Sequence, residues 1–239
     1  MKKYKILLFL TALSQLVSPY ISNFSGGGNF QELLITPAGY TFAIWGAITV
    51  FSFIFATYHL FFDKKFFTKN FYLSLSLVYI LFTVWLLVAE RNWLFLTVLV
   101  FIPMYFALLK AFKEFIFSHK LENFWDKIFL QGGIGMYVGW TTIAIILNLG
   151  VWIFSLGFDI YSKLGIVLQI ILVVLATANA VNILRKFKYN IVLFGTFWWA
   201  FVGLLVGLYG RSGTGNLIVL TLICVAVLNY IYFRNKKLS

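Results

Sequence analysis

Four tryptophans lie deep inside long apolar stretches, where their indole rings could form a binding surface: Trp45, Trp140, Trp198 and Trp199. At about 1.5 Å of helix rise per residue, each lies on the order of 10 to 14 Å from the nearer end of its stretch. An indole N–H at that depth needs a hydrogen-bond acceptor. Either a neighbouring carbonyl or hydroxyl accepts the bond and the ring fills space, or the rings line a cavity for a flat apolar ligand.

Six uncharged polar residues share these apolar stretches and need partners in the interior of a helix bundle. They are Asn148, Gln169, Asn179, Asn182, Thr141 and Thr142. Such side chains either hydrogen-bond the polar edge of a ligand or join one helix to another. The residues alone leave both interpretations open.

Charged residues are missing from the centres of the stretches, which limits the chemistry. No carboxylate is placed to couple transport to protons or cations, and the last two stretches hold no lysine for a Schiff base. His, Asp and Glu form no cluster with the spacing of metal ligands, and the single cysteine, Cys224, excludes an intrachain disulfide. We therefore predict no catalytic residue, no metal site and no enzyme activity.

The composition points to a lipid bilayer as the main partner. Hydrophobic residues make up 62% of the chain and charged residues 11%, against roughly 25% charged residues in an average soluble domain. The formal net charge of +12 does not indicate nucleic acid, because Lys and Arg occur in short clusters between apolar stretches and not along one face.

A hydrocarbon core about 30 Å thick needs roughly 20 residues of helix to cross it, and eight stretches have about that length. They cover residues 6–22, 38–61, 71–89, 93–111, 129–149, 164–184, 190–210 and 215–233. Backbone groups in hydrocarbon must bond to one another, so we expect an all-α fold, a polytopic transmembrane helical bundle of about eight helices. Residues 1–239 would form a single integral membrane domain.

The positive charges predict an orientation. Sixteen of the 19 Lys and Arg residues fall on one side of the expected bundle, and only Arg91, Lys163 and Arg211 fall on the other. Loops rich in Lys and Arg usually lie in the cytoplasm, so we expect both termini to be cytoplasmic. We expect the protein to reside in the plasma membrane of a bacterial cell. Residues 1–32 hold an N-terminal anchor helix or a signal sequence whose cleavage would leave seven helices. We favour the anchor, because the small-x-small cleavage pattern between Ser18 and Ser25 is poor.

Small residues recur four positions apart in three stretches, a pattern that permits close helix contact. They are Gly39, Ala43 and Ala47, then Gly135 and Gly139, then Gly203 and Gly207. Packing within one chain is the favoured interpretation, and a homodimer is the alternative.

Two motifs carry a family resemblance. The stretch Pro37-Ala38-Gly39-Tyr40-Thr41-Phe42-Ala43-Ile44-Trp45 has the form Pro-x-Gly-aromatic-x-Phe…Trp, and Trp140, Ala144 and Asn148 follow one another at intervals of four, on one helical face. Together they resemble the first and fourth helices of the TspO/MBR family, the translocator proteins or tryptophan-rich sensory proteins, and Asn92-Trp93 is a weaker third match. Trp45 is one residue nearer the proline than in that family, and Ala38 replaces its second proline.

The resemblance implies a TspO-like five-helix core at residues 33–185, with two additional transmembrane helices in 186–239. It also implies binding, sensing or translocation of a small flat hydrophobic ligand, such as a tetrapyrrole or sterol, in an aromatic-lined intramembrane cavity. A porphyrin would be a bound ligand, and no other cofactor is expected. The ligand-binding residues would be Pro37, Gly39, Phe42, Trp45, Trp140, Ala144 and Asn148. Trp198 and Trp199 lie outside the resemblance.

Other functions stay open. Eight helices suffice for a membrane transporter of another small solute, or for a structural membrane subunit without a ligand. An intramembrane enzyme is the least favoured alternative, because no acid–base pair lies within the expected helices.

Overall fold

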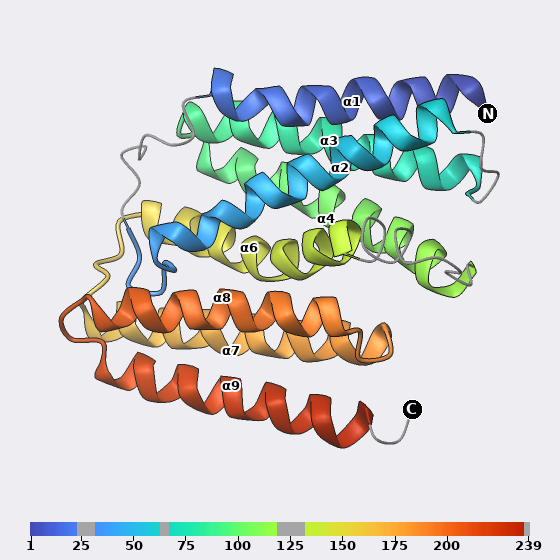
Figure 1. Cartoon of the computed structure of the whole chain (residues 1–239). Helices are drawn as coiled ribbons and strands as arrows, with labels where there is room; N and C mark the ends of the chain where they lie inside the picture. Colours follow the sequence, from blue (N-terminus) through green and yellow to red (C-terminus); the bar gives the residue numbers. More distant parts are fainter. Residues whose placement is uncertain (23–31, 63–66, 119–131, 237–239) are drawn as a thin grey trace. The chain divides into compact units, whose positions relative to one another are not determined.

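The computed structural model describes residues 1–22, 32–62, 67–118 and 132–236. Within these ranges the chain is helical and has no strand (Figure 1). The helices are α1 (Lys2–Ile21), the short 3-10 helix η1 (Gly39–Ala43), α2 (Ile44–Phe61), α3 (Lys69–Glu90), α4 (Leu94–Ser118), α6 (Gly133–Ser155), α7 (Lys163–Lys186), α8 (Ile191–Tyr209) and α9 (Gly215–Lys236). In this described part, eight helices are long and apolar enough to cross a membrane, with η1 and α2 forming one span. The prediction of an all-α bundle of about eight helices is confirmed.

Three helices begin close to the expected positions because a side chain caps their first turn. Thr68 accepts a hydrogen bond from Phe71 N at the start of α3, and Ser162 accepts one from Gly165 N at the start of α7. Asn190 Oδ1 accepts from both Val192 N and Leu193 N at the start of α8. Such caps satisfy backbone donors that have no partner within the helix.

The observed helices differ from the expected ones in two ways. The second span begins as η1 and becomes α-helical only at Ile44. Helices α4 and α6 continue to Ser118 and Ser155, past the apolar stretches expected to end at residues 111 and 149. Helical hydrogen bonds do not require apolar side chains, so α4 extends through Lys113 and Glu114 beyond its apolar run. The first residues of the expected helix at 129–149 lie outside the described residues.

The chain divides into two compact units. Unit 1 comprises Met1–Phe30 and Trp45–Val138, and unit 2 comprises Gln31–Ile44 and Gly139–Ser239. Helices α1 to α4 belong to unit 1 apart from Ile44, the first residue of α2, whereas most of α6 and all of α7, α8 and α9 belong to unit 2. The helices of the expected core at residues 33–185 are thus shared between both units, and that core stays a prediction.

Within unit 1, α3 packs against both α1 and α4. The hydroxyls of Ser14 and Thr83 lie 3.2 Å apart and join α1 to α3. Gln15 Nε2 donates to the hydroxyl of Tyr137, 3.4 Å away. These uncharged polar pairs link neighbouring helices, as expected for polar side chains of a membrane bundle.

Within unit 2, α9 packs against α7 and α8, and α8 also contacts η1. Asn179 Nδ2 donates to the carbonyl of Thr142 at 3.1 Å and joins α7 to α6. Asn179, one of the intramembrane polar residues singled out in the sequence, therefore bonds helix to helix through its side chain. Unit 2 also holds the short non-helical segment that forms the candidate site.

Candidate functional site

A small apolar cavity lies inside unit 2. Its eleven lining residues come from the segment before η1 and from α6, α7 and α8: Ile35, Pro37, Ile143, Ile146, Leu147, Leu172, Val173, Ala176, Ala200, Phe201 and Leu204. All are apolar, and Phe201 is the one aromatic residue among them. The cavity has a volume of about 20 Å³, close to the space that one water-sized sphere needs.

One wall of the cavity is the segment of residues 32–43, which we call the wall segment; residues 32–38 are not helical, and the rest is η1. The wall segment contributes Ile35 and Pro37 to the lining. Leu33, Leu34 and Ile35 are almost fully buried. Buried non-helical backbone needs hydrogen-bond partners from the rest of the protein, because water does not reach it.

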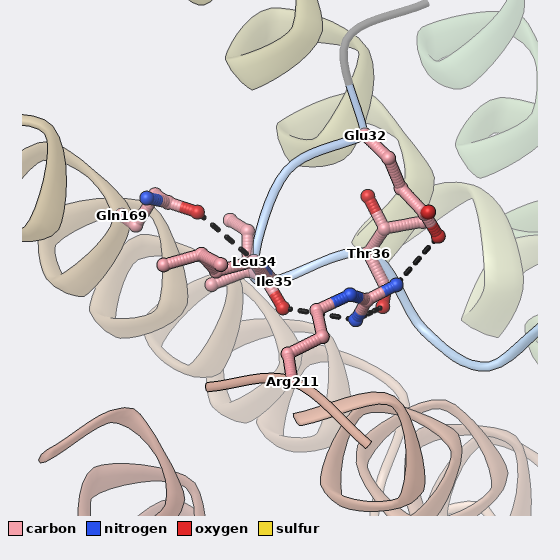
Figure 2. Close-up of polar contacts among 6 residues, drawn as sticks. All are labelled: Glu32, Leu34, Ile35, Thr36, Gln169 and Arg211. Atoms are coloured by element: carbon pink, nitrogen blue, oxygen red, sulfur yellow. Dashed lines mark hydrogen bonds and ion pairs between the residues drawn. The ribbon is translucent and has the colours of Figure 1, made fainter. Parts of the chain in front are cut away.

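Gln169 and Arg211 supply several of these partners (Figure 2). The side-chain carbonyl of Gln169, on α7, accepts a hydrogen bond from Ile35 N at 3.3 Å. Its Nε2 donates to the carbonyls of Ile160 and Gly165. Gln169 is fully buried, so its amide joins the wall segment to the start of α7.

Arg211 follows α8, and its guanidinium group bonds to backbone carbonyls and to the Glu32 carboxylate of the wall segment (Figure 2). Its Nη1 donates to the carbonyls of Leu34 at 3.1 Å and Thr36 at 2.7 Å. Its Nη2 forms an ion pair with the Glu32 carboxylate at 2.5 Å. A guanidinium group suits this role because its planar donors can reach several oxygens at once.

Helix α8 holds the other half of the wall segment. Ala38 N donates to the carbonyl of Gly203 at 2.9 Å, and Trp199 Nε1 donates to the carbonyl of Thr41 at 2.9 Å. The ring of Trp199 also meets Tyr40 edge to face, with centroids 5.5 Å apart. Trp199, which the family resemblance left unexplained, thus positions η1 on α8.

Gly203 and Gly207 allow this close approach. A Cβ atom at Gly203 would overlap the Thr41 side chain, and one at Gly207 would lie 2.7 Å from the carbonyl oxygen of Thr36. The small-residue pair on α8 therefore receives the wall segment of the same chain. Gly139 makes a similar contact, because a Cβ there would lie 2.7 Å from Cβ of Thr196.

The expected site residues of unit 2 lie in and beside the wall segment. Pro37 lines the cavity, and Gly39 begins η1. Phe42 meets Trp140 edge to face, with ring centroids 5.7 Å apart, and Trp140 is fully buried. Ala144 is buried one turn further along α6 and accepts a hydrogen bond from Asn148 Nδ2 at 2.8 Å.

Trp45, the remaining expected site residue, belongs to unit 1. Its ring packs against Phe82, Trp85 and Tyr137, with centroid distances of 5.0, 5.6 and 5.8 Å. The structure thus brings Phe42 and Trp140 together in one unit and places Trp45 among aromatic residues of the other.

The lining of this cavity is mostly aliphatic, with Phe201 as its one aromatic residue, and an aromatic-lined site stays a prediction. Three of its residues, Ile143, Ile146 and Leu147, lie on α6. At about 100° per residue, the side chains of Ile143 and Ile146 point about 100° and about 160° away from the centre of the face that carries Trp140, Ala144 and Asn148, and that of Leu147 about 60° away. The indole of Trp140 packs against Phe42 of η1 and is not among the lining residues.

Sequence reasoning missed the residues that hold the wall segment. In the sequence, Arg211 contributed only to the count of positive charges that predicts membrane orientation. Gln169 was expected only to need a hydrogen-bond partner inside the bundle. A usable signal was present, since Arg211 and Glu32 are opposite charges on the side that holds few charges. Trp198, the second unexplained indole, donates to Asn229 Oδ1 at 3.1 Å and links α8 to α9.

Comparison with known proteins places the chain in a family. A family model described as TSPO-like protein matches residues 4–233, so the chain belongs to the TSPO-like family. The matched residues include α8 and most of α1 and α9 as well as residues 33–185. No curated protein and no solved structure matches the chain.

Proposed function

We propose that this TSPO-like membrane protein binds a small, flat hydrophobic ligand, such as a tetrapyrrole or a sterol, within unit 2 beneath the wall segment. The observation that carries the proposal is the cavity, which is lined only by apolar residues and has Ile35 and Pro37 of the wall segment as one side. Concave apolar sites between helices are common places for hydrophobic ligands.

The ligand requires the wall segment to move. Pockets for small molecules measure about 300 to 1,000 Å³, whereas this cavity measures about 20 Å³. Helices α6, α7 and α8 form the rest of the lining. The wall segment instead has non-helical backbone before η1, and it is held by separate hydrogen bonds: Gln169 accepts one, and Arg211 and Trp199 donate the others. It is the part of the lining that can move with the least loss of helical structure.

The surroundings of the cavity bear on the choice between the two ligand classes. A sterol presents mostly hydrocarbon, which matches a lining without polar residues. A tetrapyrrole with carboxylate side chains also needs cationic partners. Arg211 is the cation beside the wall segment, since it bonds Thr36 next to Pro37. A tetrapyrrole would thus depend on Arg211, and a sterol would not.

A titration tests the proposal. Protein purified in mild detergent is titrated with protoporphyrin IX, read by quenching of tryptophan fluorescence, and with a fluorescent sterol, read by sterol emission. We expect saturable binding of at least one of them. If neither ligand binds saturably, the proposed ligand class is wrong. If protoporphyrin binds, Arg211→Gln should weaken it more than it weakens the sterol.

We further propose that the protein resides in a bacterial plasma membrane with both termini in the cytoplasm. The support is the charge distribution, with Arg91, Lys163 and Arg211 as the only cations on the opposite side of the expected topology. Labelling of a cysteine added at the C-terminus of a Cys224→Ser variant tests this. A membrane-impermeant maleimide should label it only after the cells are opened.

A further inference from the structure

The carboxyl ends of α7 and α9 and the start of α8 lie together at one end of unit 2. The ring of Phe194, in the first turn of α8, stacks on Tyr232, near the end of α9, with centroids 3.9 Å apart. Helix α7 ends at Lys186, and α8 begins at Ile191 after a short turn. We call this end of unit 2, with Arg185, Lys186 and Arg234, the basic end.

Arg185, Lys186 and Arg234 are exposed and come from two helices, and Lys188 and Lys236 are two further exposed cations at this end. Arg185 and Lys186 lie in the last turn of α7, and Arg234 lies in the last turn of α9. Arg234 Nη1 donates to the Tyr230 hydroxyl at 2.7 Å, which directs the guanidinium along the surface of α9.

Carboxylates of unit 2 lie at its opposite end. The sequence of this unit contains two acidic residues, Glu32 and Asp159. Glu32 pairs with Arg211 in the connection between α8 and α9, and Asp159 lies in the connection between α6 and α7. Both carboxylates therefore lie at the end of unit 2 opposite the basic end, together with the cations Lys163 and Arg211, whereas the basic end holds cations without a carboxylate among the described residues.

The turn between α7 and α8 adds to the positive field. Lys188 and Tyr189 both adopt φ of 52°, a left-handed conformation that costs about 1 to 2 kcal/mol for each non-glycine residue. This turn brings the amino end of α8 beside the end of α7. A helix amino end carries a partial positive charge and favours anions.

We propose that the basic end binds the phosphate of an anionic phospholipid headgroup, with Arg185, Lys186 and Arg234 as its cationic ligands. Guanidinium groups bind phosphate through paired hydrogen bonds. The side chains of Tyr230 and Phe233 are exposed beside Arg234 and offer apolar surface to the acyl chains of the same lipid. That apolar surface favours a lipid over free phosphate, which has no hydrocarbon to place there.

Lipid titration of the full chain in detergent tests this site. Short-chain phosphatidylglycerol and phosphatidylcholine are added separately, and bound lipid is counted by native mass spectrometry. We expect phosphatidylglycerol to bind more tightly, and the variant R185Q/K186Q/R234Q to lose at least about tenfold in affinity, since each cation near an anionic surface contributes about fivefold. Phosphatidylcholine binding should not change.

A matched variant removes the same charge from unit 1. K2Q/K3Q/K69Q should keep phosphatidylglycerol affinity within about twofold, and the charge-preserving variant R185K/K186R/R234K should keep the preference for the anionic lipid. Equal binding of both lipids, equal loss in the unit 1 variant, or displacement by inorganic phosphate at the same concentration would overturn the proposal. If the glutamine variant does not fold, the unfolding temperature of the unmodified chain decides, because it should rise with phosphatidylglycerol and not with phosphatidylcholine.

Discussion

Units 1 and 2 use tryptophan for different purposes. In unit 1, Trp45 fills space among Phe82, Trp85 and Tyr137. In unit 2, Trp199 donates a hydrogen bond to the carbonyl of Thr41 and holds the 3-10 helix η1 against α8. A tryptophan deep in a membrane helix is therefore no sign of a ligand site by itself. The backbone that the indole contacts is more informative.

The largest effect should come from Trp45→Ala in unit 1. The indole is 5% exposed and packs against three aromatic residues, so its removal leaves a cavity. We expect a loss of about 4 kcal/mol in the free energy of unfolding, measured by denaturant titration in detergent. Trp45→Phe should lose less. If a folded Trp45→Phe variant instead loses ligand affinity, the binding site includes unit 1 and the contrast between the units fails.

Gly203→Val should have the second largest effect, a loss of about 3 kcal/mol in the free energy of unfolding caused by overpacking. Any side chain at this position overlaps Thr41, which must move away from α8. Gly195→Val is the control. Gly195 lies on the same helix, and a Cβ atom there would meet no other atom within 4 Å. Thermal unfolding of both variants separates the contact from the helix propensity of valine. Equal losses would mean that the wall segment does not rest on Gly203.

Arg211→Gln should cost about 2 kcal/mol, because hydrogen bonds from a charged donor to Leu34 and Thr36 are lost. Amide hydrogen exchange over residues 33–41 should then become faster, while exchange in unit 1 stays unchanged. Arg211→Lys should restore only part of the protection, since an ammonium group lacks the planar fork. Unchanged exchange in the glutamine variant would contradict the role given to Arg211.

Trp199→Phe should have the smallest effect, about 1 kcal/mol, because it removes one hydrogen bond to the wall segment and keeps most of the ring. Trp198→Phe removes a comparable hydrogen bond to Asn229 on α9. Hydrogen exchange at residues 39–43 should rise in the first variant and not in the second. The opposite pattern would show that α9, and not α8, secures η1.

The helices could be predicted from the sequence, whereas the wall segment could not. Apolar stretches of sufficient length indicate the helices, and capping residues such as Thr68 and Asn190 determine where two of them begin. The partners of the wall segment depend on distant residues, since Ile35 and Gln169 are 134 positions apart and Glu32 and Arg211 are 179 apart. No local periodicity encodes such contacts. Phe42 and Trp140 could be proposed as neighbours only because the family resemblance placed them in one site.

The most direct test of ligand binding in unit 2 compares two alanines of α7. Ala176 lines the cavity, whereas Ala178 is exposed on the same helix. Leucine at either position adds the same volume, but only Ala176→Leu fills the cavity. The affinity for whichever ligand saturates, protoporphyrin IX or the sterol, should fall at least about tenfold in Ala176→Leu and stay unchanged in Ala178→Leu. Equal affinity in both variants would contradict a ligand site beneath the wall segment.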